Sequence, residues 1–349
     1  MNKIVTIVIP TYNMEKFLHQ CLDSLLLTDD VLFEQTEVLI VNDGSKDRSL
    51  EIAKDYEKRY PSVFRAIDKP NANYGSCVNR GLKEARGKFI KVLDADDGFY
   101  PDAYRKYVSY LCNADADMIL TGYNRVDSQQ RILHKTLFDL PVSQNFGVKD
   151  INAQKGIEMH AVTYRTQMLR DMDYRQDEGI SYTDAEWCFI PLLWVRSVSY
   201  LPVSLYRYLI GREGQTVEPQ VRIKSLWMMR KVFDRISKYY VENQESLEEA
   251  QGLMFARLIN MSSYIYRLSI PIVDNDNQKT LQEFDTNIKN TLPSLYVALD
   301  KKVLDKHLPV RYIHDWRINP SKHRFYWTAF SVLMKMKASY NRVKSSFRK

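Results

Sequence analysis

The sequence predicts an α/β protein whose first half forms a mostly parallel sheet flanked by helices. Short apolar, β-rich runs alternate with segments of helical periodicity over residues 4–122. Several of these runs end in polar residues. From about residue 219 onward, apolar residues recur mainly at helical spacing. Because alternating strands and helices imply right-handed crossovers, the first part predicts a parallel sheet and the last part a helical domain.

The elements of the first part follow from the spacing of their apolar residues. Continuous short apolar runs are typical of strands that are buried on both faces of a parallel sheet. They predict strands at residues 4–10, 38–41, 64–67, 89–93 and 118–122. Apolar residues three and four positions apart predict helices at 15–28, 50–59, 75–85 and 101–113. Pro101 suits the first position of the last of these helices.

The second part is less regular until its helices begin. Residues 124–150 lack a clear period and predict a hairpin or a mobile loop over the site. Strand-like stretches follow at 159–164 and 199–209. Helical patterns cover 226–240, 247–268 and 281–292. We therefore expect an α/β domain over 1–215, a helical domain over 216–320 and a tail over 321–349.

Composition and charge exclude several classes of protein. With 45% hydrophobic and 27% charged residues, the 349-residue chain is typical of a globular protein with a large core. Residues 321–349 carry eight Lys and Arg and no acid, which accounts for the whole net charge of +7. We therefore expect no nucleic-acid partner. The four cysteines form no CxxC pair or zinc spacing and indicate free thiols in a reducing cytosol.

The N-terminal apolar run is short and ends at Pro10 without a cleavage site. We expect a first strand there rather than a signal peptide. No apolar run approaches the length of a transmembrane helix.

An acidic cluster follows the strand predicted at 89–93: Asp94, Asp96 and Asp97, with Ala95 between the first two. Three neighbouring carboxylates repel one another, and packing gives no reason to gather them. Hard divalent cations take oxygen ligands, and Mg²⁺ commonly combines carboxylates with substrate phosphates. The cluster predicts a metal that holds a phosphorylated ligand at the carboxyl edge of the sheet, rather than a surface turn. We expect Asp96 to be the direct ligand and Asp94 to act through the sugar or a water.

Polar residues at three strand ends can converge on one cleft. Thr11 and Tyr12 follow the first strand, Asp43 the second, and the acidic cluster the fourth. Asp43 alone would only form the turn in Asn-Asp-Gly-Ser. Beside the cluster, its carboxylate can accept a hydrogen bond from a base N–H such as uracil N3. The chain contains no GxGxxG or Walker loop, so neither a Rossmann dinucleotide site nor a P-loop is supported.

Thr183-x-x-Glu186 has the pattern of a capping box. It predicts that the Glu186 side chain reaches back to the Thr183 amide. Asp184 then occupies the first helical position, where the field of the helix favours the ionised form that a general base needs.

Three further features have two interpretations each. Residues 71–87 are dense in Gly and Asn, and Asn79 can bond either a neighbouring loop or the ligand. Arg207 and Arg212 lie beside glycines and can either neutralise a pyrophosphate or be solvated. His160 lies in an apolar stretch, and we expect it to be packed rather than catalytic.

Four stretches together resemble the family 2 inverting glycosyltransferases of the GT-A fold: residues 5–13, 37–45, 75–87 and 92–97. The resemblance covers residues 3–125 and extends to about 215. It implies a GT-A fold, a nucleotide-sugar donor, most simply a UDP-sugar, and a Mn²⁺ or Mg²⁺ ion held by Asp94 and Asp96. The expected donor-binding residues are Pro10, Thr11, Tyr12, Asp43, Asn71, Gly75, Asn79, Asp94, Ala95, Asp96 and Arg212.

The resemblance also implies the catalytic base. Family members often have Glu-Asp where this chain has Thr183-Asp184, so Asp184 takes the base position and Glu186 is the fallback. Val78 replaces an Arg that many members carry. The implied reaction is transfer of a sugar, with inversion, to a hydroxyl of a glycan or lipid-linked acceptor in surface polysaccharide synthesis. The alternatives are a sugar-nucleotide nucleotidyltransferase and a non-catalytic scaffold of a membrane glycan-assembly complex.

The tail has the pattern of a basic amphipathic helix. Its apolar stripe comprises Tyr326, Phe330, Leu333, Met336, Tyr340, Val343 and Phe347. Such a helix either lies in an anionic membrane interface or packs against the helical domain or a partner. We favour the membrane, because a lipid-linked acceptor would lie there. We expect a cytoplasmic protein at the inner face of the cell membrane, with homo-oligomerisation left open.

Overall fold

The computed structural model describes residues 2–153, 156–212, 215–216, 218–272, 274–304 and 309–320. The chain divides into two compact units. The first comprises Met1–Glu218 with Asn243–Met254, and the second Pro219–Glu242 with Phe255–Lys349. The sequence places a boundary near 215 and gives every later residue to the helical part, whereas 243–254 belong to the first unit. The tail helix predicted within 321–349 lies outside the described residues.

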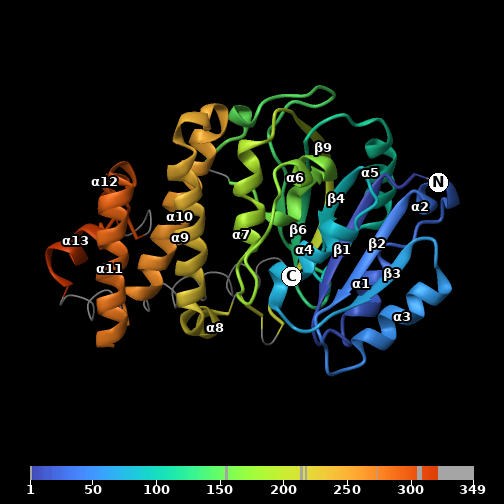
Figure 1. Cartoon of the computed structure of the whole chain (residues 1–349), viewed down its shortest axis with the longest axis horizontal. Coiled ribbons are helices and arrows are strands. Elements are labelled where there is room, and N and C mark those ends of the chain that lie inside the picture. Colours follow the sequence, from blue (N-terminus) through green and yellow to red (C-terminus); the bar gives the residue numbers. More distant parts are fainter. Residues whose placement is uncertain are drawn as a thin grey trace, which may run out of the picture. The chain divides into compact units, whose positions relative to one another are not determined.

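A nine-stranded sheet forms the centre of the first unit (Figure 1). Its order is β3-β2-β1-β4-β8-β6-β9-β5, and β7 pairs with β6. The strands are β1 (Val5–Thr11), β2 (Thr36–Asn42), β3 (Phe64–Asp68), β4 (Phe89–Val92), β5 (Gly98–Phe99), β6 (Met118–Val126), β7 (Ile132–Thr136), β8 (Val162–Arg165) and β9 (Val198–Leu209).

The sheet is parallel over β1 to β4 and mixed beyond β4. β1 pairs in parallel with both β2 and β4, and β2 with β3. β8 pairs antiparallel with β4 and with β6, so β6 keeps the direction of the first four strands. β9 is parallel to β6 and antiparallel to β5. The predicted α/β, GT-A-like fold is therefore confirmed, with a sheet that is mixed but largely parallel.

Residues 124–164 form a hairpin and a short strand, where the sequence predicted a hairpin or loop followed by a strand. A β6–β7 hairpin occupies the start of the aperiodic stretch, with β7 at Ile132–Thr136. The strand expected at 159–164 begins as a 3-10 turn, η2 (Met159–Ala161), and continues as β8.

Helices of the first unit connect these strands: α1 (Leu18–Asp23), α2 (Asp30–Glu34), α3 (Ser49–Arg59), α4 (Asn73–Glu84), α5 (Pro101–Asn113), α6 (Thr166–Asp171) and α7 (Asp184–Trp187). Short 3-10 turns are η1 (Val148–Asp150), η3 (Ile190–Leu193), η4 (Gln244–Ser246) and η5 (Glu248–Ala250). α1 is shorter than the helix predicted over 15–28. The Ser24 hydroxyl donates to the Cys21 carbonyl at 2.6 Å, and such a local bond competes with helix continuation.

The second unit is helical: α8 (Pro219–Lys224), α9 (Leu226–Glu242), α10 (Gln251–Ser269, from Phe255 onward), α11 (Asn275–Thr291), α12 (Pro293–Asp300) and α13 (Tyr312–Ile318). Its core contains aromatic contacts: the Phe284 ring lies 5.1 Å from Phe233 and 5.4 Å from Tyr266, which in turn packs on Trp316. None of the helices in the described residues is both long enough and apolar enough to span a membrane.

Candidate active site

The polar ends of β1, β2 and β4 lie together, as the sequence predicts. Thr11 at the end of β1 is paired in register with Asn42 at the end of β2, and the Asp43 amide donates to the Thr11 carbonyl at 2.8 Å. On the other side of β1, the Leu93 amide donates to the Val8 carbonyl, so the chain leaves β4 at the same edge. Both neighbours of β1 therefore deliver carboxylates to one edge of the sheet.

Asp43 anchors the loop before α4. Its carboxylate accepts hydrogen bonds from the amides of Ala72 and Asn73 at 3.0 and 2.9 Å and forms an ion pair with Lys69. The Asn71 side chain donates to the Asp43 carbonyl at 2.9 Å. Asp43 is 3% exposed. The Cys77 thiol is also hydrogen-bonded to this carboxylate, so a ligand donor would have to replace one of the present partners.

Residues 10–12 differ in how far they are exposed to a ligand. Pro10 and Thr11 are buried, and the Thr11 hydroxyl donates to the Ile9 carbonyl at 3.1 Å. Tyr12 is 46% exposed. The Tyr12 ring is therefore the part of this predicted group that a ligand can reach.

Two members of the acidic cluster are tied to the surrounding fold. The Tyr206 hydroxyl donates to Asp97 at 2.8 Å and accepts from the Asp94 amide at 3.0 Å. Asp97 also accepts from the Leu209 amide at 2.7 Å. The Tyr74 hydroxyl donates to the Asp94 carboxylate at 3.1 Å. Asp97 thus joins the cluster to β9, while Asp94 stays partly exposed.

Burial and mutual repulsion disfavour the ionised cluster. Burial, with the charge of Asp96 as the next cause, raises the pKa of Asp94 to about 6. The same two causes raise the pKa of Asp97 well above its usual range. Asp96 forms an ion pair with Arg212. The site therefore holds more negative charge than its neighbours neutralise.

Asp94, Asp97 and His160 each offer a ligand atom, and these atoms lie within 4.8 Å of one another. His160 is packed as expected, with its ring stacked 4.1 Å from Tyr208. Two carboxylates and an imidazole suit a cation such as Mn²⁺, and Mg²⁺ through the oxygens. A divalent cation would also relieve the repulsion described above, so the residues fit one. Asp96, the ligand expected first, lies outside this group.

Strand alternation separates the two predicted arginines. Tyr206 and Tyr208 both lie against His160, with ring centroids at 4.7 and 4.1 Å. Arg207 lies between them in β9 and places its guanidinium 5.5 Å from the Tyr100 ring. Of the two, only Arg212 contacts the acidic cluster. Of the two interpretations of Arg207, the structure therefore does not support a direct contact with a ligand at the cluster.

The capping box is also wrong. Thr183 precedes α7 without capping it, and its hydroxyl donates to the Gln176 side chain at 3.3 Å. The Glu186 carboxylate is buried and accepts from the Asp177 amide at 2.9 Å. Both side chains hold the 176–178 segment, which a local sequence pattern does not reveal. Glu186 therefore has a structural role, as expected, but through the Asp177 amide and not through the Thr183 amide.

Asp184 is exposed and begins α7, as predicted. It lies close enough to the cluster for its charge to act there. The Asp184 carboxylate is among the causes, after burial, that raise the pKa values of Asp94, Tyr74 and Tyr208. An accessible carboxylate thus lies within electrostatic reach of the cluster.

Gly75 and Asn79 hold the 176–178 segment. Asn79 donates to the Gln176 carbonyl and to Glu178, both at 2.9 Å, and accepts from the Gln176 amide at 2.8 Å. A Cβ on Gly75 would lie 2.0 Å from the Asp177 carbonyl oxygen, so this approach requires glycine. Of the two interpretations of Asn79, the structure contains the contact with a neighbouring loop.

Sequence reasoning missed Lys91. Its ammonium is fully buried and donates to the carbonyls of His160 and Val162 at 2.9 and 3.1 Å. Burial lowers the pKa of Lys91 to about 7. It holds the backbone that carries His160. A lysine in the middle of the apolar run 89–93 was the available signal. Tyr74 and Tyr206 were missed as well, and no local pattern marks them.

Comparisons with known proteins place this site in a family. The model of "Glycosyl transferase family 2" matches residues 6–176. YibD of Escherichia coli, an uncharacterized glycosyltransferase, is 37% identical over 218 residues, covering 59% of this chain and 61% of YibD. The poly(ribitol-phosphate) beta-N-acetylglucosaminyltransferase TarS of Staphylococcus aureus is 26% identical over 216 residues, covering 60% of this chain and 36% of TarS. The chain thus matches less than two thirds of these relatives' lengths.

Solved structures share the fold. S. aureus TarS 1–349 in complex with UDP-GlcNAc superposes with a TM-score of 0.69 at 19% identity, covering 94% of this chain and 91% of that one. The mannosyltransferase PcManGT of Pyrobaculum calidifontis, in complex with GDP-Man and Mn²⁺, has a TM-score of 0.51 at 14% identity, covering 84% of this chain and 82% of that one. Through residues 6–176 and this fold, the chain belongs to glycosyl transferase family 2.

Proposed function

We propose that the protein transfers a sugar, with inversion, from a UDP-sugar to a hydroxyl of a glycan or lipid-linked acceptor in surface polysaccharide synthesis. One observation carries the proposal: Asp184, an exposed carboxylate at the start of α7, lies near enough to the acidic cluster for its charge to raise the pKa of Asp94. Family membership supports transfer over the nucleotidyltransferase and scaffold alternatives. UDP is favoured because TarS, the structural neighbour, is described in complex with UDP-GlcNAc.

The donor would lie along the ends of β1, β2 and β4. Tyr12 offers an exposed ring for the base, and the Asp43 carboxylate would accept a base N–H in exchange for one of its present donors. Asp94 offers its carboxylate to the ribose and to a cation. Arg212 pairs with Asp96. Once a cation binds Asp96 instead, the Arg212 guanidinium can turn to the diphosphate.

A Mn²⁺ or Mg²⁺ ion held by Asp94 and Asp97 beside His160, with Asp96 as a further ligand once Arg212 releases it, would supply charge compensation for the leaving diphosphate. Asp97 holds the cluster against β9 through Leu209 and Tyr206. Asp184 removes the proton from the acceptor hydroxyl as it attacks the anomeric carbon. We expect the hydroxyl to attack the face of the sugar opposite the diphosphate, which would invert the anomeric centre.

A thermal-shift panel tests the donor and the metal together. UDP-, GDP- and dTDP-sugars are each added with and without Mn²⁺ in chelator-treated buffer. We expect a UDP-sugar with Mn²⁺ to raise the melting temperature most, because a ligand that binds the folded state stabilises it by mass action. A panel in which no nucleotide-sugar raises the melting temperature, with or without Mn²⁺, would contradict the proposal.

Residues 321–349 are proposed to bring the protein to the inner face of the cell membrane. The pattern of a basic amphipathic helix in the sequence of these residues supports it. Flotation with vesicles of anionic and of neutral lipid, using the full chain and a chain ending at residue 320, tests it. We expect the full chain alone to float with anionic vesicles, and equal flotation of both chains would exclude the tail as the anchor.

A further inference from the structure

One short segment of the chain connects Asp43, which is proposed to bind the base, with the acidic cluster. Asp43 follows β2 and accepts hydrogen bonds from the amides of Ala72 and Asn73 at 3.0 and 2.9 Å. α4 begins at Asn73, and Ala72 before it has no side chain that can cap the helix. The first amides of a helix lack partners within the helix. Asp43 therefore caps α4 from a neighbouring strand and fixes where the helix begins.

Tyr74, the next residue, contacts the site where Asp94, Asp97 and His160 offer ligand atoms to a cation. Its hydroxyl donates to the Asp94 carboxylate at 3.1 Å and lies 2.8 Å from the sulfur of Met159. A carboxylate is a much stronger acceptor than a thioether, so the proton belongs to the bond with Asp94. Met159 directly precedes His160. One side chain thus touches Asp94 and the residue beside His160.

The Asp94 carboxylate depends on this contact for its orientation. In the part of the chain that the structure describes, no other amide or side chain donates to its carboxylate oxygens. The Tyr206 hydroxyl accepts from the Asp94 amide and does not bond the carboxylate. Asp97, by contrast, accepts from both the Leu209 amide and the Tyr206 hydroxyl. Without the Tyr74 hydroxyl, the Asp94 side chain would be free to turn, whereas Asp97 would stay in place.

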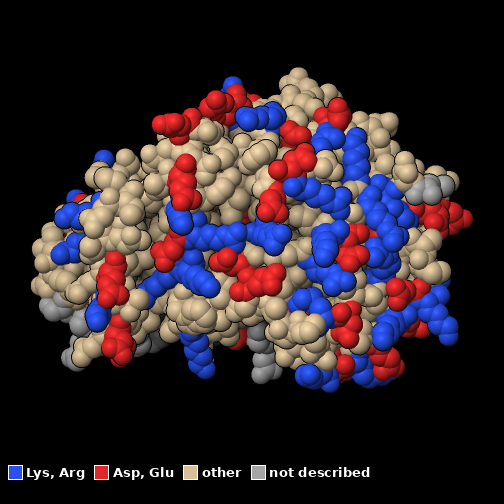
Figure 2. Space-filling view, viewed as in Figure 1, with Lys and Arg blue, Asp and Glu red and all other residues tan. Residues whose placement is uncertain are grey.

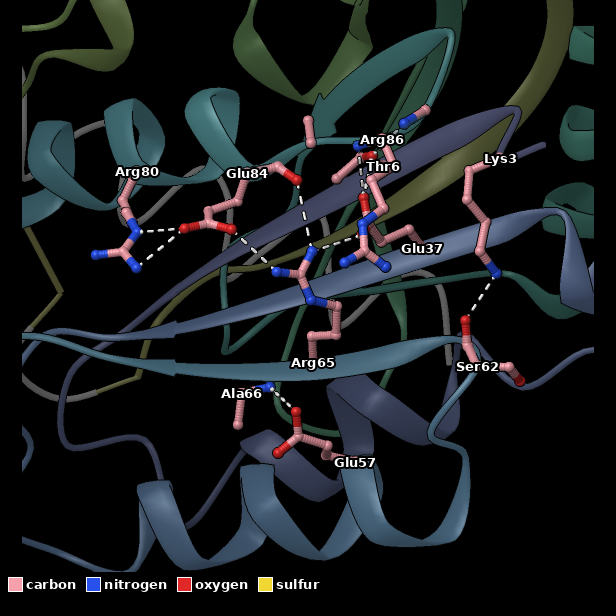
Figure 3. Close-up of polar contacts among 12 residues, drawn as sticks. Lys3, Thr6, Glu37, Glu57, Ser62, Arg65, Ala66, Arg80, Glu84 and Arg86 are labelled. Atoms are coloured by element: carbon pink, nitrogen blue, oxygen red, sulfur yellow. Dashed lines mark hydrogen bonds and ion pairs between the residues drawn. The ribbon is translucent and has the colours of Figure 1, made fainter. Parts of the chain in front are cut away.

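The later turns of α4 face a strand and the solvent. A Cβ on Gly81 would lie 2.4 Å from the Val8 side chain of β1, so helix and strand are in close contact. Figure 3 shows Arg80 paired with Glu84, at 3.0 Å. Figure 2 shows Lys and Arg side chains gathered over the part of this face where Figure 1 draws α4 and the first strands. The first turn, capped by Asp43, is the part of α4 that is bonded to the acidic cluster.

We propose that Asp43 positions the cation site through Tyr74, in addition to the base contact proposed above. The contacts run from the Asp43 carboxylate to the start of α4, from there to the Tyr74 hydroxyl, and then to Asp94. Partners that orient a metal ligand commonly contribute about 10- to 100-fold to metal affinity. The inference rests on the proposed function, because it takes Asp94 as a ligand of the cation. It adds that a residue expected at the nucleotide also sets the affinity for the metal.

The test is a titration of the metal-free full chain with Mn²⁺ in the absence of nucleotide, in which electron paramagnetic resonance measures the free ion. It is done at pH 8, where Asp94 is ionised because its pKa is about 6. Tyr74→Phe removes only the hydroxyl, and we expect it to weaken Mn²⁺ binding by about tenfold. Asp43→Asn should weaken binding by at most about tenfold on its own and should have no further effect when combined with Tyr74→Phe. A direct effect of the Asp43 charge on the cation would instead persist in the double variant.

The second unit provides matched controls, Tyr266→Phe and Asp274→Asn. Tyr266 is buried and donates to Asp285. Asp274 caps α11 by accepting from the Asn277 amide at 3.0 Å. Both controls should bind Mn²⁺ as the wild type does. Thermal unfolding shows whether each variant is folded, and Asp43→Glu, which keeps the charge but moves the carboxylate, takes the place of Asp43→Asn if the latter does not fold.

Two different failures are told apart by the wild-type titration. Wild-type binding with an unchanged affinity in Tyr74→Phe, or with additive losses in the double variant, would overturn the inference and leave the proposed function standing. No Mn²⁺ binding by the wild type would overturn the inference together with the cation of the proposed function. The nucleotide-sugar panel described above uses the wild type and tests the donor separately.

Discussion

Both ends of the parallel strands carry buried carboxylates, and the two ends treat them differently. At the amino end, Glu37 is 1% exposed and accepts hydrogen bonds from the Thr6 hydroxyl and the Arg86 amide at 2.7 and 2.8 Å. Arg65 pairs with it at 2.9 Å (Figure 3). At the carboxyl end, Asp94 and Asp97 receive hydroxyl and amide donors, but the charge beside them is another carboxylate.

The fully partnered carboxylate at the amino end holds the fold together, whereas those at the carboxyl end are available to a ligand. A buried charge with a full set of partners is costly to break. A buried charge among like charges lowers stability and is found where function requires it. The carboxyl end is therefore the part of the sheet that we expect to be destabilised without a ligand and stabilised by a cation and diphosphate.

The largest effect is expected from Asp184→Asn. Removal of a general base lowers the rate of the chemical step by about 1,000-fold. Donor affinity should stay close to that of the wild type, because Asp184 is not among the residues proposed to bind the donor. Transfer assays give the rate, and titration with the donor gives the affinity. Asp102→Asn, an exposed residue in the first turn of α5, is the control and should keep full activity. Normal turnover by the Asp184 variant would remove this residue from the mechanism.

Glu37→Gln tests the amino end. It leaves Arg65 and the Arg86 amide with a weaker partner in a buried position, and we expect a loss of about 3 kcal/mol in the free energy of unfolding. Chemical denaturation measures it. Glu51→Gln removes an exposed pair with Arg48 and should leave the denaturation midpoint in place. If both variants were equally stable, the contacts of Glu37 at the amino end of the strands would not stabilise the fold.

Arg212→Ala is expected to weaken donor binding by about tenfold, the contribution of one charge-assisted hydrogen bond to phosphate. Isothermal titration with UDP and Mn²⁺ measures the change. Arg207→Ala is the matched control, since that guanidinium packs on Tyr100 away from the cluster. Equal weakening in both variants would mean that general charge, and not the position of Arg212, sets the affinity.

The last prediction concerns the pH dependence that Lys91 gives to stability. Its pKa is lowered by burial to about 7, so the unfolded chain binds the proton more tightly than the folded one. Stability of the wild type should therefore rise with pH between about 7 and 10, by at most about 1.4 kcal/mol per unit. Lys91→Met lacks this contribution, so the difference between the two proteins should change over that window. A constant difference from pH 7 to 9 would contradict a buried ammonium that titrates there.

The sequence predicted the first half of the fold well, because local patterns there coincide with tertiary structure. Continuous apolar runs became β1 to β4, and their polar ends met at one edge as parallel strands must. The helix at Pro101–Asn113 matched its predicted ends. The antiparallel insertion of β8 between β4 and β6 was not predictable, because strand order is set by long-range pairing.

For the site too, local patterns predicted some features and missed those that depend on long-range contacts. Asp43, the acidic cluster and the start of α7 at Asp184 followed from residue types at strand and helix ends. The contacts that position them did not. Glu186 bonds the Asp177 amide rather than its own helix end, and Lys91 holds two carbonyls of a distant segment. The sequence left the role of Arg207 open, because its side in β9 depends on strand alternation.

The most direct test compares Asp94→Asn with Glu37→Gln by unfolding in chelator and again with UDP and Mn²⁺. Because the pKa of Asp94 is raised, its ionised form costs stability at neutral pH, and the neutral variant should be at least as stable as the wild type without metal. It should then gain little from UDP and Mn²⁺, whereas Glu37→Gln should lose stability without ligand and gain as much as the wild type with it. An Asp94 variant that unfolds more readily in chelator and responds normally to UDP and Mn²⁺ would contradict the account.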